Sequence, residues 1–168
     1  TGVQTWLFRS RCEHGDLAAP IRIREGIALS LFKTSAGRVF LTYLPYSDVQ
    51  HVIEREIRET KWWTTPGEGE MTIEDQQRYK DLKHVVADVN VIKTEVRTHG
   101  VARSYGTQHP SYASLSAPVF SRDRKLQLAI SLIGVQGTFD LDYEGNPARQ
   151  LRVFARKLSE KLGWTPVP

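Results

Sequence analysis

The sequence has little of what would cross-link the chain or hold it in a membrane. Its single cysteine, Cys12, excludes an internal disulfide and is typical of a reducing compartment, which predicts a cytoplasmic location. No apolar run reaches the roughly 18 residues that a membrane-spanning helix needs. The first residues lack the basic lead and apolar stretch of a signal peptide. We therefore expect no association with a membrane.

Enzyme motifs are also missing. The sequence has no G-x-S-x-G, no P-loop and no G-x-G-x-x-G pattern. Nothing near Cys12 supplies the base that a nucleophile needs. The five histidines are scattered, without the spacing that positions metal ligands in advance: His14, His51, His84, His99 and His109. The sequence predicts neither catalysis nor a metal or other cofactor, and a small enzyme is the weakest alternative.

What is present is ordinary globular composition. The chain has 168 residues, of which 40% are hydrophobic and 25% charged, with a net charge of +4. These values fit one domain that can bury its own core. The basic residues form no stripe with interleaved aromatics, so nucleic-acid binding by this chain itself is not predicted. Because the chain lacks an initial methionine and begins directly in strand-like sequence, we expect an excised domain.

Apolar residues alternate with polar ones in several short segments, as in half-buried strands. Residues 3–12 and 18–24 are predicted to form a strand pair, and 101–105 a short strand. Residues 112–134 are predicted to form a strand, a charged turn at 121–125 and a second strand.

Other segments have helical spacing. Residues 33–45 predict a short helix that stops before the final proline of that segment, with Thr34 or Ser35 as its N-cap. Ser47 with Gln50 has the pattern of a capping box, which predicts a second, amphipathic helix to about residue 61.

Two more helices complete the pattern. A long helix is predicted from residue 72 to the residue before Gly100, which suits a left-handed residue just past a helix end. The last helix is predicted to start with Asn146 as N-cap and Pro147 as first residue, and to end at Gly163. Since strands and helices are grouped rather than strictly alternating, we predict an α+β fold with a largely antiparallel sheet.

Two groups of small polar residues are candidates for binding. Thr34–Gly37 would leave backbone N–H groups exposed at a helix start, where the helix dipole favours an anion. Ser114 and Ser116 share one face of a predicted strand. An ordinary N-cap, a glycine needed for close packing and strand hydroxyls bonded to main chain are the structural alternatives.

Read together, three segments resemble a known family. "LFKTSAGRVFLTYLP", "RTHGVARSYGTQHPSYASLSAPVFSRDRKLQLAISLIG" and "ARKLSEKLG" are similar, in order and at about the right spacing, to the effector-binding C-terminal domain of IclR-family bacterial transcription regulators. The resemblance extends over about residues 18–163. It implies a profilin-like or GAF-like sensor fold, an antiparallel sheet flanked by helices on both sides, with a small-molecule effector over the sheet.

The resemblance also implies partners. It identifies residues 1–168 as a single regulatory domain whose N-terminal winged helix-turn-helix domain is absent here. In the family that domain binds operator DNA as homodimers or tetramers, and effector binding rearranges the oligomer to repress or activate transcription. A GAF- or PAS-type sensor domain of another signalling protein is the alternative.

The family's effector-binding positions fall on six residues of this sequence: Ser35, Ala36, Ser104, Ser114, Ser131 and Ile133. The resemblance implies that Ser35 and Ala36 contact the effector through backbone amides. Ser104 stands where many members have Asp, Ser114 where many have Cys, and Ile133 where a second Ser often accompanies Ser131. We therefore expect a less polar site and a larger or more apolar effector, such as an aromatic acid.

One segment exceeds the family's usual length. The loop "WWTTPGEGE" at 62–70 carries Trp62 and Trp63, which are unusually apolar for a loop. It is expected to cover the pocket or to join an oligomer contact, with one of the tryptophans as anchor. Ordinary core aromatics are an equal alternative.

Overall fold

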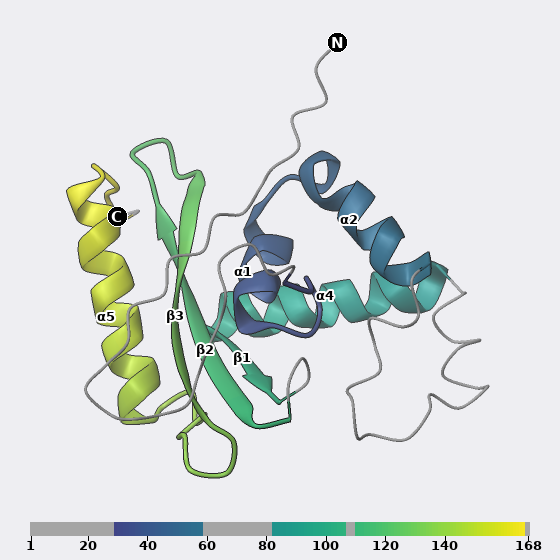
Figure 1. Ribbon diagram of the computed structural model, residues 1–168. Coiled ribbons are helices and arrows are strands. Elements are labelled where there is room, and N and C mark those ends of the chain that lie inside the picture. Colours follow the sequence, from purple (N-terminus) through teal and green to yellow (C-terminus); the bar gives the residue numbers. More distant parts are fainter. Residues whose placement is uncertain (1–28, 59–81, 107–109, 167–168) are drawn as a thin grey trace.

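The computed structural model describes residues 29–58, 82–106 and 110–166 of the chain (Figure 1). The predicted strand pair at 3–12 and 18–24, the loop at 62–70 and the start of the long helix at residue 72 lie outside the described residues.

The described residues form four helices and a three-stranded sheet, so the α+β prediction is confirmed. In chain order the elements are α1 (Ser35–Tyr43), α2 (Tyr46–Arg58), α4 (Leu82–His99), β1 (Ala102–Tyr105), β2 (Tyr112–Phe120), β3 (Leu126–Val135) and α5 (Asn146–Lys161). The strands lie in the order β1-β2-β3 and both pairings are antiparallel. None of the helices in this part of the chain is long and apolar enough to cross a membrane.

Helices cover both faces of the sheet. Figure 1 shows α5 on one side and α1, α2 and α4 on the other. The α5 face is apolar, because Leu115, Ala117 and Val119 of β2 form one buried cluster with Leu151 and Ala155 of α5. Successive side chains of a strand point to opposite faces, so the even-numbered residues of β2 face α1.

The helices on the second face have a core of their own. Val39 and Leu41 of α1 are buried with Ile92 and Val96 of α4 and with Ala102 of β1. A buried aliphatic side chain of this kind contributes about 1.5–3 kcal/mol relative to an exposed one. This packing holds α1 against the sheet, where its first turn meets the middle of β2.

The start of α1 agrees with the sequence, but the predicted start of α2 was wrong. Thr34 is the N-cap of α1, and its hydroxyl accepts from the Gly37 amide at 2.9 Å. The α2 helix begins at Tyr46, before the predicted Ser47–Gln50 capping box. The carbonyl of Pro45 accepts from the Asp48 amide at 3.0 Å, so the first turn already includes Ser47, whose hydroxyl bonds the Asp48 carboxylate instead.

The last helix starts one residue earlier than predicted. Gly145 has extended backbone angles and is the N-cap, so Asn146 is inside the helix and its side chain accepts from Gln150. A Cβ on Gly145 would lie 2.2 Å from a carboxylate oxygen of Asp140, so a larger residue there would require the Asp140 side chain to shift. Gly163, at a φ of 83°, follows the end of this helix, in agreement with the sequence.

Candidate functional site

Four serine hydroxyls form a continuous hydrogen-bonded chain between α1 and the sheet. The Oγ of Ser35 lies 2.6 Å from that of Ser114 and 2.7 Å from that of Ser116. The Oγ of Ser116 lies 2.7 Å from that of Ser131. The structure therefore brings together Ser35, Ser114 and Ser131, which the sequence predicted as site residues, through the additional Ser116. We call these four residues the serine chain.

Strand register explains why these residues meet. Ser114 lies opposite Ser104 of β1 and Ile133 of β3, and Ser116 lies opposite Ser131. Cross-strand partners project from the same face of a sheet, with Cβ atoms about 4.5–5.5 Å apart. All five side chains consequently lie on the face that α1 covers.

The serine chain extends from the interior to the surface. Ser35 is 1% exposed and Ser116 is fully buried. Ser114 is partly exposed and Ser131 is exposed. The two ends of the serine chain are therefore accessible to solvent, while the middle hydroxyls are enclosed by protein.

The first turn of α1 adds backbone donors beside these hydroxyls. The Arg38 amide makes the first helical hydrogen bond, to the Thr34 carbonyl at 3.0 Å. The amides of Ser35 and Ala36 precede that bond, so the helix itself offers them no acceptor. Because Ser35 belongs to both groups, the amides and the serine chain lie next to each other.

Gly37 is required for close packing, which was the alternative to an anion site at Thr34–Gly37. A Cβ at this position would lie 2.1 Å from the Ser30 carbonyl oxygen and 2.7 Å from the Leu31 Cα, both main-chain atoms. The first turn of α1 thus lies directly against the turn that precedes it.

Ser104 has a different role from the other predicted serines. Its hydroxyl donates to the Lys33 carbonyl at 2.6 Å, and the residue is 5% exposed. Ser104 therefore fixes the turn before α1 to strand β1, beside the serine chain.

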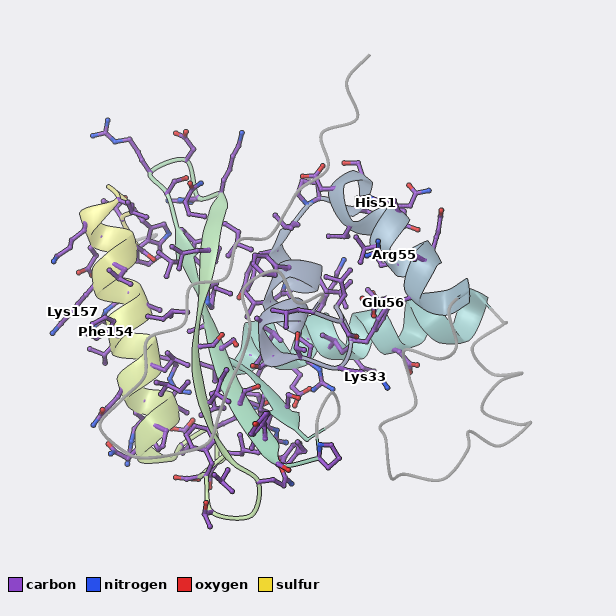
Figure 2. The ribbon with its side chains drawn as sticks, in the orientation of Figure 1. Lys33, His51, Arg55, Glu56, Phe154 and Lys157 are labelled. Carbon is purple, nitrogen blue, oxygen red and sulfur yellow. The ribbon has the colours of Figure 1, made fainter. Side chains whose placement is uncertain are left out.

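The sequence analysis missed Glu56, a buried carboxylate that holds the same turn. Its two oxygens accept from the Ser30 hydroxyl and the Leu31 amide, each at 2.7 Å. Burial raises the pKa of Glu56, and the hydrogen bonds from Leu31 and Ser30 oppose that shift. Glu56 is buried although His51 and Arg55 of the same helix are exposed (Figure 2). Its signal in the sequence was a charged residue on the apolar stripe of α2, three positions after Ile53.

Arg38 was also missed. Its guanidinium donates to the Phe32 carbonyl at 2.8 Å and to the Arg103 carbonyl at 2.9 Å. Burial lowers the pKa of Arg38, and Glu95 raises it. Arg103 in turn pairs with Glu95 at 3.5 Å and lies 4.2 Å from the centre of the Tyr143 ring. Arg38 thus connects the turn before α1 to β1, and the ion pair of Arg103 with Glu95 connects β1 to α4.

A groove lies elsewhere, along α4. It has a volume of about 680 Å³, is wide open to solvent and is lined by Asn90, Val91, Thr94, Glu95, Thr98 and His99. The six predicted site residues do not line it. Across the described ranges, no three His, Cys, Asp or Glu side chains are grouped so as to hold a metal ion.

Comparison with known proteins identifies the family. The pattern of the bacterial transcriptional regulator IclR C-terminal domain matches residues 10–160. The chain belongs to the IclR family. A curated relative, the uncharacterized HTH-type transcriptional regulator RhmR of Escherichia coli K12, is 26% identical over 144 residues. The match covers 86% of this chain and 49% of RhmR, so the chain spans about half the length of this relative.

Several solved structures, the IclR of Thermotoga maritima among them, share the fold. HmgR of Pseudomonas aeruginosa superposes with a TM-score of 0.66 at 22% identity, over 86% of this chain and 50% of HmgR. The Thermotoga maritima IclR gives 0.64 at 16% identity, over 90% and 55% of the two chains. The C-terminal domain of E. coli KdgR gives 0.56 at 20% identity, over 80% and 71%. The GAF-like fold that the resemblance implied is thereby confirmed.

Proposed function

We propose that this chain is the effector-sensing domain of an IclR-type regulator and that the serine chain and the first turn of α1 bind a small carboxylic acid. The observation that carries the proposal is the position of Ser35, whose hydroxyl joins Ser114 and Ser116 at the start of α1. Ser35 therefore places two backbone amides that have no acceptor within the helix, its own and that of Ala36, beside hydroxyls that reach the surface.

Each group in the site has a chemical task. The amides of Ser35 and Ala36, at the positive end of the α1 dipole, receive the carboxylate. Ser114 and Ser131 bond further polar atoms of the effector, and Ile133 provides an apolar wall. Such a combination of apolar surface with a few convergent donors is the usual form of a ligand site. Ser104, Glu56 and Arg38 hold the turn that sets the position of these amides.

The proposal includes a route from effector to DNA. The domain acts in the cytoplasm in a homodimer or tetramer, without catalysis, and its effector favours one arrangement of the subunits. The DNA-binding domains then move into or out of register with the operator half-sites. The effector can shift the equilibrium between the two arrangements by no more than the difference between its binding free energies for them.

A ligand screen with site variants tests the proposal. Acids that bind the folded protein raise its melting temperature, so we expect stabilisation by members of a panel of acetate, lactate, pyruvate, benzoate, phenylacetate and mandelate. Ser114→Leu and Ser131→Leu should each abolish that shift, because leucine removes the hydroxyl and fills the space beside it.

The matched control is Ser121→Leu, in the turn after β2. It adds the same bulk seven residues from Ser114 and should leave the shift intact. An acid whose effect survives both Ser114→Leu and Ser131→Leu would show that the effector binds elsewhere, and a panel without any effect would contradict acid sensing.

A further inference from the structure

The serine chain has a fixed supply of hydrogens. Each hydroxyl carries one hydrogen and can accept from two donors. Four hydroxyls are joined here by three hydrogen bonds: Ser114 to Ser35, Ser35 to Ser116, and Ser116 to Ser131. Each bond uses one hydrogen. One hydrogen therefore remains for a group outside the chain.

The direction of the three bonds decides where that hydrogen lies. In each pair either oxygen can be the donor. Ser35 and Ser116 are enclosed, so an outside group meets the chain at Ser114 or at Ser131. If Ser131 keeps the free hydrogen, Ser114 donates inward to Ser35 and presents only lone pairs outward. In the opposite direction the roles of the two ends are exchanged.

From this count we infer that the effector is a hydroxy acid. The inference rests on the proposed function, because it assumes that the effector binds at the serine chain. A ligand that touches both ends must accept a hydrogen bond at one end and donate one at the other. The carboxylate has enough lone pairs to accept from the amides of Ser35 and Ala36 and also from the donating end of the serine chain, and a hydroxyl on the same molecule supplies the donor. A keto acid or a dicarboxylate offers acceptors only, so one end of the chain would face it with lone pairs or one internal bond would break.

The distance between the ends suits a small molecule. Ser114 is opposite Ile133, so Ser131 is its diagonal neighbour on the adjacent strand. Diagonal neighbours of an antiparallel pair are about 7–8 Å apart. A short carbon skeleton spans this separation, and Ile133 beside both ends favours an apolar substituent on it.

Matched ligands test the inference on the wild-type protein. Mandelate, phenylglyoxylate and phenylacetate share a ring and a carboxylate and differ in one group, a hydroxyl, a carbonyl or neither. Isothermal titration calorimetry should give one mandelate enantiomer an affinity about fivefold or more above the other two acids, the effect of one net hydrogen bond. Lactate, pyruvate and propionate should rank in the same way. Equal or tighter binding of the keto acids overturns the inference.

Removing the Ser116 hydroxyl, in the middle of the serine chain, should abolish the preference for hydroxy acids. Ser116 is fully buried and so does not touch the effector itself. In Ser116→Ala, the pair Ser114–Ser35 keeps one free hydrogen and Ser131 gains another, so both ends can donate. Because the hydroxyl of mandelate can also accept a hydrogen bond, phenylglyoxylate should then bind about as tightly as mandelate. Ser116→Thr keeps a hydroxyl and should keep the wild-type order.

The control is Ser159→Ala, which removes a buried serine of α5 whose hydroxyl donates to the Ala155 carbonyl, outside the serine chain. It should leave the ligand order unchanged, and an unchanged order in Ser116→Ala would overturn the inference. Failure of the proposed function looks different: no acid binds, or binding ignores Ser114→Leu and Ser131→Leu. If binding depends on those two serines but favours keto acids, the hydroxy-acid inference is wrong and the proposed function still holds.

Discussion

The two faces of strand β2 are both covered by helices but have different chemistry. Toward α5 the strand presents Leu115, Ala117 and Val119, whose apolar surface is removed from water. Toward α1 it presents Ser114 and Ser116, which gain little from burial and need hydrogen-bond partners.

The polar face meets that need. No buried side-chain nitrogen or oxygen in the described part of the protein lacks a hydrogen-bond partner. The two faces of β2 thus differ in what they contribute. The apolar face stabilises the fold, whereas the serine face carries hydrogen-bonding hydroxyls that a purely structural core does not require. Substitutions on the two faces should therefore have separable effects on stability and on effector binding.

Leu115→Ala should cause the largest loss of stability. The side chain is fully buried against α5, and its truncation leaves a cavity. We expect the free energy of unfolding, measured by urea denaturation, to fall by about 2–5 kcal/mol. Effector affinity of the folded fraction should stay at the wild-type value. A loss of affinity at temperatures where the variant is folded would show that the two faces are not independent.

Gly37→Ala tests the serine face. The added Cβ would collide with main-chain atoms of the preceding turn, so the first turn of α1 must shift. Overpacking of this kind costs about 1–3 kcal/mol, and effector binding should be lost together with it because the amides of Ser35 and Ala36 move.

The control for that substitution is Gly137→Ala, after β3. Gly137 has a φ of 87° and open space around it, so alanine adds strain of about 1–2 kcal/mol without a collision. This variant should bind effector normally. If both variants lose binding equally, general destabilisation explains the loss.

Glu56→Gln should change the pH dependence of stability. Because burial raises the pKa of Glu56 in the folded state above its ordinary value of 4.5, the unfolded chain loses this proton first as pH rises. Glu56 therefore makes the wild type lose stability as pH increases from about 4.5 to the folded-state pKa. Glutamine does not titrate, so the variant's free energy of unfolding should decline less across that interval in denaturation at stepped pH.

Identical profiles for Glu56→Gln and the wild type would mean that Glu56 ionises in the folded protein as it does in water.

Local patterns fixed much of this fold in advance. The α1 helix begins after Thr34, whose hydroxyl caps it, and ends before the proline that follows Leu44, as the sequence predicted. Helix starts that depend on a single backbone hydrogen bond were predicted too late, by two residues at Tyr46 and by one at Asn146. Cap geometry is set by neighbouring main chain, such as the Pro45 carbonyl, and side-chain type alone does not specify it.

By itself the sequence determined which side chains share a face, because strand alternation is a local property of the backbone. It also determined the family, through motifs in a fixed order. Only the tertiary structure decided that Ser35 bonds Ser114 and Ser116, residues 79 and 81 positions away. Likewise, Glu56 and Arg38 acquire their roles only once α1 and α2 are packed in place. The partner of a hydroxyl or a carboxylate depends on how a helix packs on a sheet, and apolar contacts among residues far apart in the sequence set that position.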